Sequence, residues 1–252
     1  MAARFQAILL PGVVLPAEIA YAALIGALGE EADTVAKELE VYAGDEPPAD
    51  YSLGHEIDGI LRTADGAGFE RFHLVGYSAG GASSLMFAAA HGARLLSLAL
   101  LEPAWAGNEG LDPAEEALSR EFDRLVDLPP DEMMAAFVRM QLAPDASPPP
   151  PPEGDPPPWM AKRPAGIRAF NGATASAELD LGALSRFGRP VYYALGGLSN
   201  PDYYGKMAAR LERVFPDFTL EVFEDRHHFD PPHRIEPERL AASLRALWGR
   251  AP

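Results

Sequence analysis

Ser78 has the sequence surroundings of a catalytic nucleophile. It is the central residue of a Gly-x-Ser-x-Gly pattern, with Gly76 and Gly80 two positions away on either side. The residues 72–75 before it, Phe-His-Leu-Val, predict a buried strand, and the small residues of 81–90 after it predict a helix. A serine on so tight a turn is held in strained backbone angles, which lift its hydroxyl out of the fold at the positive end of the helix. The alternative interpretation is an ordinary turn whose serine caps the helix.

The motif and the elements around it resemble those of the α/β-hydrolase family, and the resemblance extends over nearly the whole chain. It implies a mostly parallel sheet covered by helices on both faces. It also implies a helical cap inserted between the sixth and seventh strands in the family's numbering, which are 95–101 and 191–195 in this chain. It also implies hydrolysis through a covalent acyl-enzyme, which needs neither a metal nor an organic cofactor. No glycine-rich dinucleotide fingerprint follows the first predicted strand.

The resemblance implies a general base on the loop after the last strand, where His227 and His228 are found. The pair His228-Phe229 matches the His-Phe or His-Leu pair that is usual at this position in the family, so His228 is the expected base. His233 is a more distant candidate. A loop histidine is often only a surface residue, but a neutral imidazole is what a serine hydroxyl needs to lose its proton.

Three carboxylates compete for the role of the acid that orients the imidazole. Most of the family carries this acid after the seventh strand, but that loop here reads Gly-Gly-Leu-Ser-Asn-Pro and has no carboxylate before Asp202. Asp202 is explained more simply as a helix cap, and Asp225 would need a tight turn to reach the far ring nitrogen. Some members place the acid after the sixth strand, where Glu102 lies. A charge there is costly to bury without a partner such as a histidinium, so Glu102 is the expected acid.

Two backbone N–H groups are expected to bind the oxyanion of a tetrahedral intermediate. One belongs to Ala79, directly after the nucleophile. The resemblance implies that the other comes from the loop after the first strand, where Pro11-Gly12 stands in place of the family's usual His-Gly and Val13 is the expected donor. A simple turn at the end of the strand is the alternative interpretation.

The remaining elements are predicted from the spacing of apolar residues. The further predicted strands are 5–10, 34–42, 95–101, 191–195 and 218–223. The further predicted helices are 16–28, 51–67, 112–127, 131–142, 202–214 and 237–248. In the first helix, Ile19 and Leu24 are expected to face the core. Apolar strands that alternate with helices indicate an α/β fold with a parallel sheet, and Ser78, Val13 and Glu102 all follow predicted strands, where such sheets bind ligands.

The strand pattern is interrupted between residues 106 and 186. We therefore expect residues 1–105 and 187–252 to form an α/β-hydrolase core and residues 106–186 a helical cap with a proline-rich loop. The Met, Phe and Trp residues of this segment would line an apolar substrate pocket or only pack the cap onto the core. The five successive prolines Pro148–Pro152 are typical of a stiff or disordered loop with polyproline II character, and less so of a ligand for an SH3-type domain.

Composition bears on partners and location. The chain has 252 residues and is 48% hydrophobic, which suffices for one α/β domain with a sizeable core. A formal net charge of -16 disfavours nucleic acid and anionic membranes as partners, so a small-molecule substrate is expected, and a homodimer is compatible with these features. The absence of cysteine excludes disulfides and thiolate nucleophiles. Neither a secretory signal nor a transmembrane helix is visible, so a cytoplasmic location is expected.

The function expected from these features is that of a serine hydrolase. It would cleave an ester-type bond of a small or medium apolar substrate through an acyl-enzyme on Ser78. The same residues could serve a thioesterase, an amidase or a hydrolase of carbon–carbon bonds, because the difference lies in the shape of cap and pocket. Alternatives from other classes are a non-catalytic ligand-binding protein on an α/β-hydrolase fold and an interaction module built on the proline run.

Overall fold

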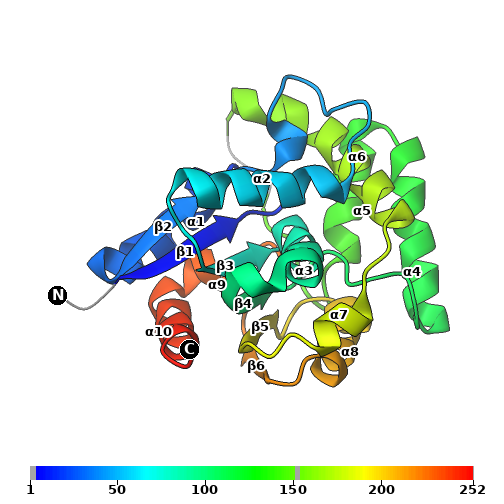
Figure 1. The fold of residues 1–252 in the computed structure, drawn as a ribbon. Coiled ribbons are helices and arrows are strands. Elements are labelled where there is room, and N and C mark those ends of the chain that lie inside the picture. Colours follow the sequence, from blue (N-terminus) through cyan, green and yellow to red (C-terminus); the bar gives the residue numbers. More distant parts are fainter. Residues whose placement is uncertain (1–3, 151–153, 252) are drawn as a thin grey trace.

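The computed structural model, which describes residues 4–150 and 154–251, has a parallel β-sheet at its centre (Figure 1). The sheet order is β2-β1-β3-β4-β5-β6, and each neighbouring pair is parallel. The strands are β1 Phe5–Leu10, β2 Ala32–Ala36, β3 Phe72–Tyr77, β4 Leu95–Leu101, β5 Val191–Gly196 and β6 Phe218–Phe223. The α/β-hydrolase arrangement predicted from the sequence is confirmed, with β3 and β4 in the middle of the sheet.

Helices cover both faces of this sheet. One face is covered by α1 Ala17–Leu28, α9 Pro232–Ile235 and α10 Pro237–Trp248, and the other by α2 Leu53–Gly66, α3 Ala79–His91, α7 Leu181–Ser185 and α8 Lys206–Val214. Ile8 and Leu74 pack into the core under α2 and α3, whereas their neighbours Leu9 and Val75 pack into the core under α1 and α10. The central strands β1, β3, β4 and β5 are mostly apolar because successive side chains point to opposite faces and both faces are buried, whereas the edge strands β2 and β6 carry polar residues and are more exposed.

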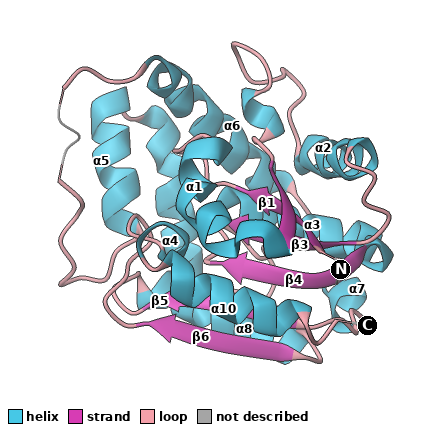
Figure 2. Ribbon diagram, turned by 90° about the vertical axis from the view of Figure 1, so that its left-hand side faces the viewer, coloured by secondary structure: helices cyan, strands magenta, loops and turns pink. Residues whose placement is uncertain are grey.

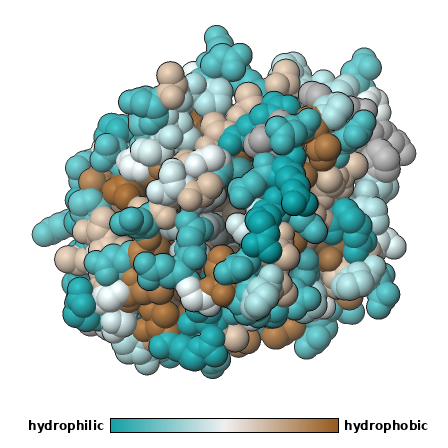
Figure 3. Space-filling model, turned by 90° about the vertical axis from the view of Figure 1, so that its right-hand side faces the viewer, coloured by the Kyte–Doolittle hydropathy of each residue, from teal (hydrophilic) through white to brown (hydrophobic). Residues whose placement is uncertain are grey.

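Between β4 and β5 the chain leaves the sheet and forms a layer over the carboxyl ends of the strands (Figure 2). This layer contains α4 Pro113–Arg124, α5 Pro130–Met140 and α6 Arg163–Ser176. Met133, Phe137 and Phe170 are buried in a cluster that also includes Val13 and Ala79 of the sheet edge, so the apolar residues of the insertion do pack onto the core. On the side that faces water, hydrophobic residues occur in small groups among hydrophilic ones (Figure 3). The division of the chain at residues 106 and 187 stays a prediction.

Two sequence predictions are wrong in detail in the N-terminal part. The strand expected over 34–42 ends at Ala36, and Glu40–Tyr42 forms a 3-10 turn instead. The reason is the buried carboxylate of Glu56, which accepts the backbone N–H groups of Glu40 at 3.0 Å and Val41 at 3.2 Å, so these groups do not join a sheet ladder. In α1, Ile19 is 49% exposed, and the core face is formed by neighbours such as Leu24.

The insertion also departs from the sequence prediction. Helix α6 was not predicted, because its mixture of small, polar and basic residues gives weak periodicity. The helix expected over 202–214 begins with a π-helical turn, Pro201–Gly205, before α8. Of the proline run, Pro148–Pro150 are exposed, and Pro151 and Pro152 lie outside the described residues. Among the helices that the structure describes, none is long and apolar enough to cross a membrane.

Candidate active site

The turn between β3 and α3 holds Ser78 in a conformation that few residues other than glycine adopt, with φ 54° and ψ -117°. Close packing around the turn explains the flanking glycines. A Cβ at Gly76 would lie 2.3 Å from the carbonyl oxygen of Gly80, and a Cβ at Gly80 would lie 2.3 Å from that of Leu10. The Ser78 side chain makes no capping hydrogen bond to α3, which argues against the simple helix-cap interpretation. Its hydroxyl is instead held by a side chain from the other end of the chain.

That side chain is His228, on the loop after β6. Its Nε2 lies 3.1 Å from Ser78 Oγ, and its Nδ1 lies 3.0 Å from Glu102 Oε2. The other carboxylate oxygen of Glu102 accepts the backbone N–H of Gly196 at 2.7 Å. All three side chains are buried, with exposed fractions of 3% for Ser78, 5% for Glu102 and 1% for His228. Because an ionised carboxylate only accepts, the Nδ1–H donates to Glu102, and Nε2 is left to accept the Ser78 hydroxyl proton.

The competing residues lie elsewhere. Asp202 is on the surface, with its side chain 67% exposed and 3.1 Å from Lys206 Nζ. Asp225 is exposed on the loop after β6, and His227 is partly exposed beside it. Burial lowers the pKa of His227. The structure therefore brings Glu102 to His228 and leaves the other two carboxylates apart from it.

Two tyrosine rings enclose the His228 imidazole, and neither was identified from the sequence. The Tyr77 ring lies 4.9 Å from it at 29°, and the Tyr204 ring lies 4.6 Å from it at 13°. The Tyr77 hydroxyl also donates to the backbone carbonyl of His228, and the Tyr204 hydroxyl donates to Gln141 Oε1 at 2.6 Å. Burial raises the pKa of both tyrosines well above their ordinary value, so they stay neutral. Tyr204 belongs to the π-helical turn, and such turns are frequent at functional sites.

The expected oxyanion donors lie on either side of Ser78. Ala79 is the first residue of α3, so its N–H has no acceptor within the helix. The next N–H, that of Gly80, is already bonded to the carbonyl of Pro11 at 2.9 Å. Gly12, the residue before Val13, packs closely against the turn at Ser78, since a Cβ at Gly12 would lie 3.1 Å from Ser78 Cβ. Val13 and Ala79 both line a cavity with Ser78.

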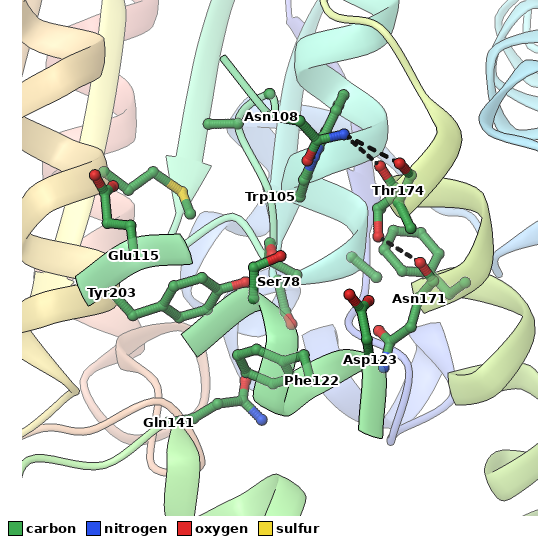
Figure 4. Close-up of a pocket in the computed structure, with 18 of the residues that line it drawn as sticks. Ser78, Trp105, Asn108, Glu115, Phe122, Asp123, Gln141, Asn171, Thr174 and Tyr203 are labelled. Atoms are coloured by element: carbon green, nitrogen blue, oxygen red, sulfur yellow. Dashed lines mark hydrogen bonds between the residues drawn. The ribbon is translucent and has the colours of Figure 1, made fainter. Parts of the chain in front are cut away.

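Two cavities open at Ser78. The first, about 80 Å³, lies beneath α4 and α6 and is called the α4–α6 cavity (Figure 4). The second, about 320 Å³, lies between the loops after β1 and β6 and includes Pro149 and Pro150; it is called the His228 cavity. Within residues 4–150 and 154–251, no group of three or more His, Asp or Glu side chains is arranged to hold a metal ion.

Comparison with known proteins agrees with this architecture. The sequence matches the alpha/beta hydrolase family over residues 8–243, and the chain belongs to this family. A search of curated proteins gave no match.

The fold is similar to solved structures of hydrolases at low sequence identity. An esterase from Thermogutta terrifontis is 18% identical with a TM-score of 0.69, over 96% of this chain and 88% of the other. A carboxylesterase from Bacillus subtilis is 16% identical with a TM-score of 0.64, over 98% and 84% of the two chains. A hydrolase from Oleispira antarctica is 12% identical with a TM-score of 0.71, over 99% and 92%. These likenesses identify the fold, and a hydrolase is the class of protein that fold and family define.

Proposed function

We propose that this hydrolase cleaves carboxylic esters through a covalent acyl-enzyme on Ser78. The observation that carries the proposal is the pair of hydrogen bonds that link Glu102, His228 and Ser78, at 3.0 and 3.1 Å. The three residues follow β4, β6 and β3, so they meet at the edge where parallel sheets bind ligands. Burying a carboxylate and an imidazole in contact is costly in free energy, and a binding protein would have no need of this arrangement.

In the first half of the reaction, Ser78 Oγ attacks the ester carbonyl carbon while His228 Nε2 takes the hydroxyl proton. The carbonyl oxygen becomes an oxyanion and accepts hydrogen bonds from the backbone N–H groups of Ala79 and Val13. Glu102 stabilises the imidazolium that forms. The carbon–oxygen bond to the alcohol then breaks, and the departing oxygen takes the proton from Nε2.

In the second half, a water molecule replaces the alcohol. His228 takes a proton from this water, whose oxygen attacks the acyl carbon of the Ser78 ester. Collapse of the second tetrahedral intermediate breaks the bond to Ser78 Oγ, which recovers its proton from Nε2. The products are the free acid and the regenerated serine.

A fluorophosphonate probe tests the proposal, because it phosphonylates only an activated serine. We expect labelling of the folded wild-type protein at Ser78, hydrolysis of p-nitrophenyl butyrate, and loss of both in Ser78→Ala. Alanine fits the turn, so the variant should unfold at a similar urea concentration. Ser185→Ala, which removes an exposed serine on α7 that lines neither cavity, is the control and should still be labelled. Wild-type turnover in Ser78→Ala would exclude the mechanism, and a folded wild type that is neither labelled nor active would favour a binding protein.

A further inference from the structure

The two cavities at Ser78 divide any bound ester into two parts. Ser78, Val13 and Phe137 line both cavities, whereas Ala79 lines only the α4–α6 cavity and His228 only the His228 cavity. A substrate whose carbonyl carbon lies at Ser78 Oγ therefore extends one part beneath α4 and α6 and the other past the imidazole. The two parts meet different side chains and are selected separately.

The path of the proton decides which part lies where, given the proposed function. The departing alcohol oxygen must take its proton from His228 Nε2, so it has to lie on the imidazole side of the carbonyl carbon. The alcohol then lies in the His228 cavity. The acyl part, which remains on Ser78 until water attacks, lies in the α4–α6 cavity.

Most polar side chains of the α4–α6 cavity already have partners within the protein. The amide of Gln141 is bonded to a backbone carbonyl at 2.8 Å and to a tyrosine hydroxyl at 2.6 Å. The amide of Asn108 accepts an indole N–H at 2.8 Å and donates to backbone carbonyls, the nearest at 3.0 Å. Glu115 forms an ion pair with Arg210 across the cavity wall. Apart from Arg210 Nε, these groups stabilise the wall and have little capacity left for a ligand.

Asn171 is different. Its side chain extends from α6 toward the cavity (Figure 4), and its Nδ2 is buried without a hydrogen-bond partner among the described residues. Arg210 Nε, which belongs to the same cavity, is a second buried donor to which no described residue is hydrogen-bonded. Leaving a buried donor unpaired is costly in free energy, and a bound water or ligand is one explanation for such a group in a folded protein. Both groups are donors, so their complement is an acceptor atom.

The charges around the cavity indicate that this acceptor is neutral. The charges of Glu115 and Arg210 cancel, and the further charged residue on the lining is Asp123, which is exposed. The whole chain also carries a net charge of -16. A carboxylate on the acyl chain would be repelled, whereas an ether or carbonyl oxygen would not.

We propose that the acyl part of the substrate carries a neutral acceptor oxygen that binds Asn171 Nδ2, and that the alcohol part lies in the His228 cavity. The inference rests on the proposed function, because it needs Ser78 and His228 in their roles. It assigns a substrate class, esters of ether- or oxo-substituted acids.

Isosteric ester pairs test the role of Asn171. Methoxyacetate, 3-methoxypropanoate and 4-methoxybutanoate p-nitrophenyl esters are compared with the butanoate, pentanoate and hexanoate, each rate being divided by that of alkaline hydrolysis. We expect kcat/KM to favour the ether in at least one pair by about fivefold to tenfold, the effect of one buried hydrogen bond. Asn171→Leu and Asn171→Ala should both bring this ratio close to unity. Ser176→Ala, on the same helix but outside both cavities, should keep the wild-type ratio.

The assignment of the cavities is tested with Leu15→Trp, which narrows the His228 cavity. For a series of alcohols on one acyl group, it should change kcat/KM with alcohol size. It should leave unchanged the ether-to-methylene ratio and the rate at which the acyl-enzyme is hydrolysed, which depends only on the acyl part. The reverse pattern, no ether preference in the wild type, or an ether preference that persists in both Asn171 variants would overturn the inference. If Ser78→Ala retained activity, the proposed function would fail instead, so the two failures are distinguishable.

Discussion

The backbone of Glu102 has φ 47°, in the left-handed region where residues other than glycine are uncommon. In this conformation both oxygens of the Glu102 carboxylate have partners. One oxygen accepts the N–H of Gly196 at the end of β5, and the other faces His228. Strain of this kind persists only where the surroundings hold the residue in place, and it clusters at functional sites.

At this scale we predict that Glu102→Gln lowers kcat about a hundredfold or more while the fold is kept. The amide has the shape of the carboxylate, but it is neutral and cannot stabilise the imidazolium. Stopped-flow and steady-state rates with p-nitrophenyl butyrate measure the change, and urea unfolding verifies the fold. Asp202→Asn is the matched control and should remain near wild type, because Asp202 is a surface partner of Lys206. The opposite ranking of the two variants would place the acid after β5.

At the scale of elements, a buried histidine of β3 contacts both β4 and α10. His73 Nδ1 lies 2.8 Å from Ser97 Oγ, and its ring stacks on Trp248 at 5.1 Å. Burial lowers the pKa of His73 from 6.5 to about 4. As pH falls below 6.5, the unfolded chain takes up a proton at this residue while the folded chain does not, so stability is lost until the pH reaches about 4.

We therefore predict that the free energy of unfolding falls as the pH is lowered, and that His73→Phe removes this part of the fall. Between about pH 7 and pH 4.5, the free energy of unfolding of the wild type should fall by about 2–3 kcal/mol more than that of the variant. Phenylalanine keeps the ring packing, and the unpaired Ser97 hydroxyl lowers the stability of the variant by an amount that does not vary with pH. Urea unfolding at several pH values measures both slopes. Equal slopes would show that His73 takes up a proton in the folded protein as readily as in the unfolded chain over this pH range.

At the scale of the whole molecule, the insertion is tied to the loop that carries Val13. The guanidinium of Arg163, at the start of α6, lies 3.9 Å from the centre of the Tyr42 ring. The Tyr42 hydroxyl donates to the carbonyl of Val13 at 2.7 Å. Gly166 leaves room for this ring, since a Cβ there would lie 2.1 Å from Tyr42 Cε1. The helices over the sheet therefore help to position a proposed oxyanion donor.

This link predicts that Tyr42→Phe lowers kcat about tenfold with little change in KM, because the bond to the Val13 carbonyl helps to hold the residue whose N–H, in the preceding peptide unit, is the proposed oxyanion donor. The free energy of unfolding should fall by only about 1 kcal/mol. Tyr51→Phe is the matched control: it removes a hydrogen bond of 2.8 Å to Glu56 and does not touch Val13. It should lower stability and keep kcat. A similar loss of kcat in both variants would mean that general destabilisation, and not the position of Val13, is responsible.

The sequence by itself determined the sheet, most of its helices and the turn at Ser78, because these depend on nearby residues. A strand buried on both faces must be mostly apolar, as in 95–101, where Ser97 is the one polar residue. Gly76 relieves a contact with Gly80, four residues further on, although the contact that Gly80 itself relieves is with Leu10 of β1. The end of β2 could not be predicted in this way, because the carboxylate of Glu56, on α2, accepts hydrogen bonds from the backbone N–H groups of Glu40 and Val41.

Only the tertiary structure decided which carboxylate meets His228. Glu102 and Asp202 both follow strands of the sheet, and the order of residues along the chain does not distinguish them. Glu102 lies 126 positions from His228 in sequence, and their contact depends on how β4, β5 and β6 stand side by side. The stacking of Tyr204 on the imidazole is of the same kind. Such contacts are set by the packing of distant elements, because the reach of a side chain is short and local sequence does not encode what lies opposite it.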